Sequence, residues 1–198
     1  MVKRRNNRWQ ELGQEFHMAI GQCIAAWARV DDELFGIFRD CVGPYEQSAI
    51  IYYRTPGLDV RFALTDEIVR SVLPKRPKRS GAHEHPSVKA WDAARDGYQE
   101  LLATRRRIAH HPVGIRSEPF RVGMPIGVEP PSWFEIYVSQ HERLREKSSD
   151  LPPLNVSDLK SHLAAVVALQ ARLHRFFHEV LTKRAGESST PSPSKSLG

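Results

Sequence analysis

The sequence of 198 residues contains few of the features that assign a protein to a familiar class. Its two cysteines, Cys23 and Cys41, fall on one predicted helix, which excludes a disulfide framework and indicates a reducing compartment. No apolar run approaches the length of a membrane span, and the basic start is not followed by the apolar core of a signal peptide. We therefore expect a soluble, cytoplasmic protein without a membrane association.

The common catalytic and metal-binding motifs are also missing from the sequence. It has no phosphate-binding glycine loop, no GxSxG and no HExxH. His83 and His85 have no nearby cysteine or third ligand that would complete a metal site. The sequence thus predicts neither a cofactor nor a metal.

Positive charge is in moderate excess. The formal net charge is +6 and the isoelectric point is near 9.5. A basic balance permits a polyanionic partner such as nucleic acid, although it does not by itself prove one.

Apolar residues recur at helical spacing over most of the chain. They predict a long first helix from about Gln10 to Cys41, ended by Gly43-Pro44. A second helix is expected from Tyr45, with a break at 55–57 and a continuation from Leu58 to Leu73. Pro86-Ser87 opens a third helix that ends near His110, and Ser157 is expected to cap the last long helix.

Residues 113–140 have a different pattern, with glycine, proline and two β-like runs, Phe120–Val122 and Trp133–Val138. The predicted fold is therefore all-α, a four- to five-helix bundle with a small β-hairpin insertion between the third and last long helices. We expect a flexible basic arm over 1–9, one domain over 10–185 and a disordered tail over 186–198.

The end of the third helix, LLATRRRIAHHP, is the most informative stretch. On a helical wheel Arg105 falls within the apolar face that carries Trp91 and Tyr98, whereas Arg107 points roughly opposite. Asp31 lies on the apolar face of the first helix. A charged residue on a buried stripe is costly without a partner, so Asp31 and Arg105 are expected to meet or to line one polar cleft.

A purely structural interpretation of this stretch is also open. Arginine and histidine are favoured near helix C-termini by the helix dipole alone. The register is ambiguous as well, because Arg106 and His111 have the same spacing as Arg105 and His110. Arg61 would add positive charge around a cleft, or would simply be a solvated helix residue.

The segment from Arg105 to His110 resembles the Arg-x4-6-His signature of HEPN domains, and Trp27–Asp31 is similar to a pattern in their first helices. The resemblance implies a helical bundle, usually dimeric, with two motifs facing each other. Many members are metal-independent endoribonucleases of toxin–antitoxin or other defence systems, and others bind nucleotides, RNA or a protein. Arg106 departs from the asparagine usual in the family, and Pro112 replaces a tyrosine that some members carry.

The resemblance implies that Arg105 and His110 are the catalytic pair. We expect Asp31, Arg106, His111 and Arg61 to be the supporting residues of the site. It implies RNA as the partner, with tRNA one candidate, a homodimer, and an antitoxin or other protein partner. His110 would carry protons near neutral pH and Arg105 would hold a phosphate. The alternatives are a non-catalytic module that binds RNA, nucleotide or a partner, and a helical interaction protein in which an Asp31–Arg105 pair is structural.

Overall fold

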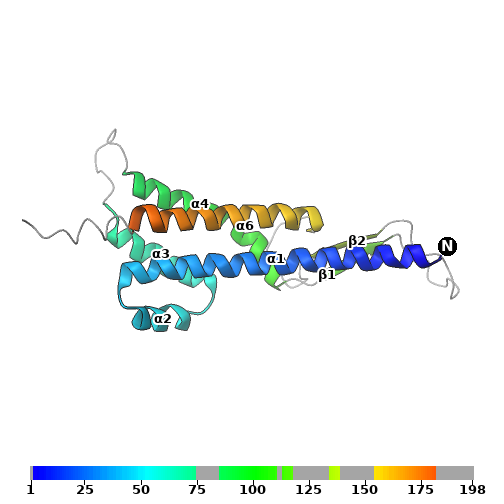
Figure 1. Ribbon diagram of the computed structural model, residues 1–198, viewed down its shortest axis with the longest axis horizontal. Coiled ribbons are helices and arrows are strands. Elements are labelled where there is room, and N and C mark those ends of the chain that lie inside the picture. Colours follow the sequence, from blue (N-terminus) through cyan, green and yellow to red (C-terminus); the bar gives the residue numbers. More distant parts are fainter. Residues whose placement is uncertain (1, 75–84, 111–112, 118–133, 139–153, 182–198) are drawn as a thin grey trace, which may run out of the picture. The chain divides into compact units, whose positions relative to one another are not determined.

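The computed structural model describes residues 2–74, 85–110, 113–117, 134–138 and 154–181, with side-chain surroundings given from residue 11 onward and, in the strands, at Val113 and Val138. This part of the chain is mostly helical, as the sequence predicts (Figure 1). It contains five helices: α1 (Val2–Val42), α2 (Tyr45–Arg54), α3 (Leu58–Val72), α4 (Pro86–His110) and α6 (Val156–Phe176). A π-helical turn, η1 (Phe177–Leu181), extends the last of them.

The breaks between helices fall where glycine and proline predict them. α1 ends before Gly43, whose φ of 126° is a conformation that residues with a side chain rarely adopt. Gly57, immediately before α3, also has a positive φ, of 77°. The predicted separation of α2 from α3 at residues 55–57 is confirmed.

The start of α1 differs from the prediction. The helix begins at Val2, so residues 2–9 belong to it. The flexible basic arm over 1–9 stays a prediction. The predicted start near Gln10 was wrong. That prediction rests on the periodicity of apolar residues, and the basic residues before Gln10 carry no apolar stripe that would extend the helix over them. The expected tail over 186–198 lies outside the described residues.

Two short strands, β1 (Val113–Ser117) and β2 (Phe134–Val138), pair antiparallel, with Val113 opposite Val138 and Ser117 opposite Phe134. β2 coincides with one of the two predicted runs. The other run, Phe120–Val122, and the connection between the strands lie outside the described residues. The compact hairpin insertion therefore stays a prediction.

The contacts within the chain define two compact units, and α1, α4 and α6 each contribute to both. Unit 1 comprises residues 1–26 and 100–166, and unit 2 comprises residues 27–99 and 167–198. Whether residues 10–185 form one domain stays a prediction.

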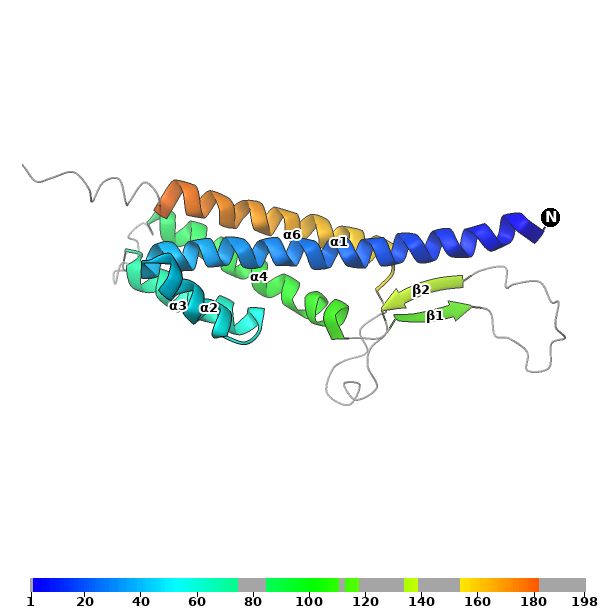
Figure 2. The same ribbon diagram turned by 60° about the horizontal axis from the view of Figure 1, so that its bottom comes forward.

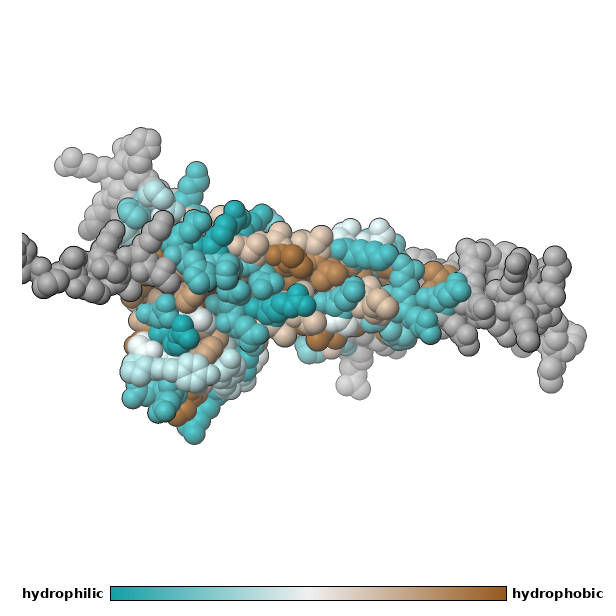
Figure 3. Space-filling view, in the orientation of Figure 1, coloured by the Kyte–Doolittle hydropathy of each residue, from teal (hydrophilic) through white to brown (hydrophobic). Residues whose placement is uncertain are grey.

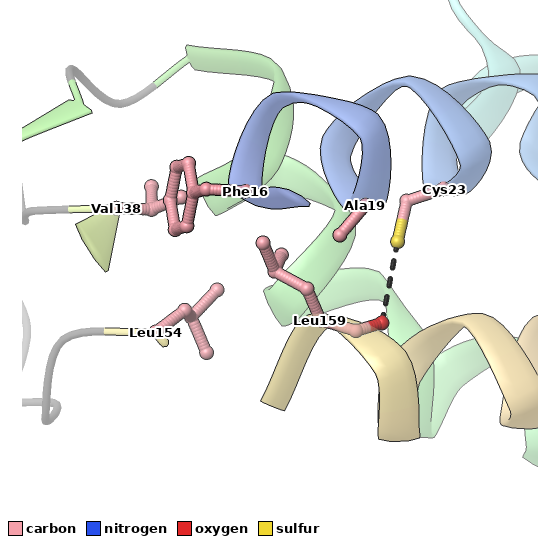
Figure 4. Close-up of a cluster of buried hydrophobic side chains, with 6 residues drawn as sticks. All are labelled: Phe16, Ala19, Cys23, Val138, Leu154 and Leu159. Atoms are coloured by element: carbon pink, nitrogen blue, oxygen red, sulfur yellow. Dashed lines mark hydrogen bonds between the residues drawn. The ribbon is translucent and has the colours of Figure 1, made fainter. Parts of the chain in front are cut away.

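Unit 1 has an apolar cluster that joins the first half of α1 to the start of α6 and to β2 (Figure 4). Phe16, Ala19 and Cys23 follow one another at helical spacing along α1 and pack against Val138, Leu154 and Leu159. The Cys23 thiol donates a hydrogen bond of 3.4 Å to the carbonyl of Leu159, and burial raises the pKa of this thiol. The cysteine is thus a buried, protonated core residue.

Unit 2 is built around stacked aromatic rings. The rings of Phe62 on α3 and Tyr98 on α4 are parallel, with centroids 3.8 Å apart, and Trp27 on α1 meets Tyr98 edge-on. Trp91 on α4 is also stacked on Phe62, with centroids 6.1 Å apart. The polar atoms of Trp91 and Tyr98 are satisfied, because the Trp91 indole donates to Asp66 at 2.6 Å and the Tyr98 hydroxyl to Asp59 at 3.1 Å. Figure 2 shows α2 and α3 beside the later half of α1. Aromatic packing thus holds this unit together.

The start of α6 is fixed by a reciprocal pair of hydrogen bonds. The amide of Asp158 donates to the side-chain oxygen of Asn155 at 3.0 Å, and the amide of Asn155 donates to the Asp158 carboxylate at 2.9 Å. Asn155 is therefore the capping residue, and the assignment of this role to Ser157 was wrong. Both residue types are good caps, and the capping box completed by Asp158 distinguishes the two positions.

We expect Asn155→Ala to lower the free energy of unfolding by about 1 kcal/mol, because it leaves amide donors at the start of α6 without their acceptor. Ser157→Ala is the matched control and should change it by less than about 0.5 kcal/mol. Urea denaturation followed by circular dichroism measures both. Equal effects of the two substitutions would contradict the capping role of Asn155.

Candidate functional site

The last two turns of α4 place the predicted site residues in different environments. Arg105 is half-buried, whereas Arg106 and His110 are exposed. At about 100° per residue, Arg106 and His110 are only about 40° apart around the helix, and Arg105 is about 140° from His110. The helix thus brings Arg106 and His110 onto one exposed face. His111 lies outside the described residues.

Arg107 is the buried arginine of the three. Its residue exposure is only 8%, which corrects the expectation that Arg107 points to solvent and Arg105 is buried. Burial lowers the pKa of Arg107, and the negative charge of Asp158 on α6 acts in the opposite direction. The helical wheel gave the wrong result because it assumes the same buried face along the whole of α4. Residues 100–110 belong to unit 1, whereas the earlier part of α4 belongs to unit 2, so the two parts of the helix pack against different neighbours. Ile108, for instance, packs against the cluster around Phe16.

His162 is a second buried polar residue of unit 1, and the sequence did not single it out. It lies one turn beyond Asp158 on α6. Burial lowers its pKa to about 4, so the imidazole is neutral near neutral pH. Its position within the apolar pattern of α6, next to Leu163 and Val166, was the signal that could have identified it.

Asp31 in unit 2 forms a polar network with the two helices that follow α1. Its carboxylate accepts a hydrogen bond of 2.7 Å from the Tyr52 hydroxyl and an ion-paired hydrogen bond of 2.7 Å from the Arg61 guanidinium. Arg61 also donates to the carbonyl of Thr55 at 3.0 Å and lies 5.4 Å from the ring centroids of Tyr52 and Tyr53. The network therefore joins α1, α2, the 55–57 turn and α3.

The network holds Tyr52 in its neutral form. Burial, together with the hydrogen bond to Asp31, strongly raises the pKa of the Tyr52 phenol. A phenol that remains protonated is a permanent donor to the carboxylate. Asp31 was expected on a costly buried stripe, and Tyr52 and Arg61 are the partners that offset that cost.

The predicted site residues thus fall into two groups. Asp31 and Arg61 are brought together in unit 2, and Arg105, Arg106 and His110 lie in unit 1. The described partners of Asp31 belong to its own unit. The pairing of Asp31 with Arg105 stays a prediction.

Among the residues that the structure describes, no group of three or more His, Cys, Asp or Glu side chains is arranged to hold a metal ion. Within the same residues, no helix is both long enough and apolar enough to cross a membrane. No protein-family model, curated protein or solved structure matches the chain.

We expect Asp31→Asn to lower the free energy of unfolding by about 1–3 kcal/mol, because it removes the negative charge that pairs with a largely buried Arg61. Asp32→Asn is the matched control, since Asp32 is the exposed neighbour on the same helix and should tolerate the change. Chemical denaturation measures both. If Asp31→Asn is as stable as Asp32→Asn, the network contributes nothing to stability.

His162 should make stability depend on pH. Its folded pKa of about 4 lies below the unfolded value of about 6.5, so the unfolded chain binds a proton that the folded chain excludes. The contribution of the neutral His162 to the free energy of unfolding is fully present above a pH of about 6.5. It is lost as the pH falls toward the folded pKa, and the total loss is about 3 kcal/mol at most. Urea titrations at several pH values should give His162→Gln a shallower acid loss than the wild type. Identical slopes for the two proteins would contradict the burial of a neutral His162.

Proposed function

We propose that the protein is a metal-independent endoribonuclease of the toxin or defence type that the HEPN resemblance implies, and that its site is the end of α4. The observation that carries the proposal is the shared exposed face of Arg106 and His110. A group that transfers protons near neutral pH and a guanidinium that binds phosphate are both accessible to a polymer there. The proposal includes the bundle arrangement of the helices and the hairpin insertion.

The reaction needs proton transfer at two oxygen atoms of RNA. A neutral His110 takes the proton of the 2′-hydroxyl as its oxygen attacks the adjacent phosphorus. The bond from phosphorus to the 5′-oxygen breaks, and a protonated histidine gives that oxygen a proton. The products are a 2′,3′-cyclic phosphate and a free 5′-hydroxyl. No metal takes part in these steps.

The arginines stabilise the charge that develops on the phosphate. Arg106 is exposed on the face of His110, and its planar fork matches two phosphate oxygens. Arg105, half-buried one position earlier, is a second phosphate ligand in the proposal, as the resemblance implies. Arg107 is assigned no contact with RNA because it is buried.

A homodimer is part of the proposal, since one His110 per chain supplies one acid or one base. Two copies that face each other would supply both groups from a single motif. The net charge of +6 favours the approach of RNA, tRNA included, at low ionic strength. An antitoxin or other protein partner that covers the site would restrain the activity in a cell.

A non-catalytic module is the second candidate, and the same exposed face supports it. Arg106 and His110 at a helix end are sufficient to hold RNA, a nucleotide or an acidic segment of a partner protein without any bond cleavage. Binding without cleavage is therefore the alternative that the experiment must separate from catalysis.

We expect the wild type to cut labelled total RNA and tRNA in the presence of a chelator and to leave cyclic-phosphate ends. His110→Ala should reduce the cleavage rate by about 10²–10⁴-fold, because it removes the proton-transfer group. Arg106→Ala should weaken cleavage, and the loss relative to the wild type should be largest at low salt and shrink as the salt concentration rises, because salt weakens the phosphate contact that the variant lacks. His17→Ala, which removes another exposed histidine of unit 1, is the control and should cut at the wild-type rate.

Binding to the same RNAs is measured in parallel with cleavage. Folded wild-type protein that binds RNA, depends on Arg106 for binding and leaves the RNA intact would establish the non-catalytic alternative. Wild-type protein that neither binds nor cuts RNA would refute both assignments. Cleavage that His110→Ala retains in full would assign the activity to other residues.

A further inference from the structure

α2 presents most of its surface away from unit 2. Of its ten residues, only Ser48 and Tyr52 are buried. Ile50, Ile51 and Tyr53 are 53%, 47% and 50% exposed. Figure 3 shows brown, apolar residues among teal ones over α2. Exposed isoleucines are costly in water, and their concentration on one short helix indicates that this face meets another surface.

The outward face has a regular arrangement. At about 100° per residue, Ile50 lies opposite the buried pair Ser48 and Tyr52 and so forms the centre of the face. Glu46 lies one turn before Ile50 and Arg54 one turn after it, about 40° around the helix on opposite sides of Ile50. The face is thus an isoleucine between an acidic and a basic residue.

The two charges are equally far from Ile50 and opposite in sign. Within the described part of the chain, neither Glu46 nor Arg54 forms an ion pair, and both are exposed. A face with this pattern is complementary to its own copy. A two-fold axis through Ile50 sets two α2 helices antiparallel and brings Glu46 of each copy opposite Arg54 of the other. A parallel arrangement would instead oppose like charges.

We propose that the outward face of α2 binds the same face of a second copy of this chain, antiparallel and centred on Ile50. α2 is suited to this role because it is fixed to its unit. The Tyr52 hydroxyl donates to Asp31, and the Ser48 hydroxyl donates to the carbonyl of Gly43 at 3.2 Å. A fixed helix loses little conformational freedom when it pairs.

The pairing is a weak one. A ten-residue helix covers less than the roughly 800 Å² per partner of a standard interface, so monomer and dimer exchange with concentration. The proposal does not rest on the ribonuclease assignment, because α2 belongs to unit 2 and contains neither Arg106 nor His110. Its test reads the response of the dimer to charge changes on α2 and uses no RNA. A dimer that these changes leave intact would overturn the α2 interface and leave the ribonuclease proposal standing, whereas a wild type that stays monomeric would contradict the α2 interface and also the homodimer included in that proposal.

The experiment is sedimentation velocity of the full chain from micromolar to millimolar concentration. The wild type should dimerise. E46R should weaken the dimer by about tenfold or more, because it sets two basic side chains against each other at two symmetric positions. R54E should weaken it similarly through two acidic side chains. I50D, at the centre of the face, should abolish it. Glu67→Arg on α3 changes an exposed charge of unit 2 outside the face and is the matched control.

Charge exchange separates a direct contact from a general loss of structure. The double variant E46R/R54E should dimerise like the wild type, because each copy again presents one acid and one base. An equimolar mixture of E46R and R54E should form a heterodimer tighter than either homodimer. A wild type that stays monomeric throughout, or a dimer that E46R and R54E leave unchanged, would overturn the proposal. Weakened single variants without recovery in the double variant and the mixture would overturn it as well.

Discussion

The carboxylate of Asp31 is the interaction on which the arrangement of unit 2 depends. One oxygen accepts from Tyr52 on α2 and the other from Arg61 on α3, so a single side chain of α1 fixes both following helices. Arg61 extends the network to the Thr55 carbonyl in the turn between them. Each partner would be costly to bury alone, and together they satisfy one another. The 2.7 Å contacts therefore position α2, including its outward face.

Most of the helical framework could be predicted from the sequence because its signals are local. Gly43-Pro44 and the 55–57 turn interrupt an otherwise periodic pattern, and both breaks appear where glycine and proline require them. The errors arose where the periodicity of apolar residues does not decide. The start of α1 carries no apolar stripe, and Asn155 and Ser157 are both capable caps until the contact with Asp158 distinguishes them.

The candidate site was less predictable, since burial depends on which elements surround a helix. The wheel identified Asp31 as a residue that needs a partner, but it could not indicate Tyr52 and Arg61, which are 21 and 30 residues further along the chain. On α4 the wheel predicted the burial of Arg105 from the face of Trp91 and Tyr98. Those rings belong to unit 2, and the neighbours of the last turns are those of unit 1.

The burial of Arg107 has a consequence for the exposed end of α4. If the end of α4 turned about its axis, the Arg107 guanidinium would move into solvent and Ile108 would leave the apolar cluster around Phe16. The burial of Arg107 and the packing of Ile108 therefore fix the orientation of the helix end. In that orientation Arg106 and His110 are exposed together. Asp158 contributes twice, because it completes the cap of α6 and places negative charge near Arg107. The buried arginine thus belongs to the support of the exposed pair, and the three consecutive arginines have different physical roles.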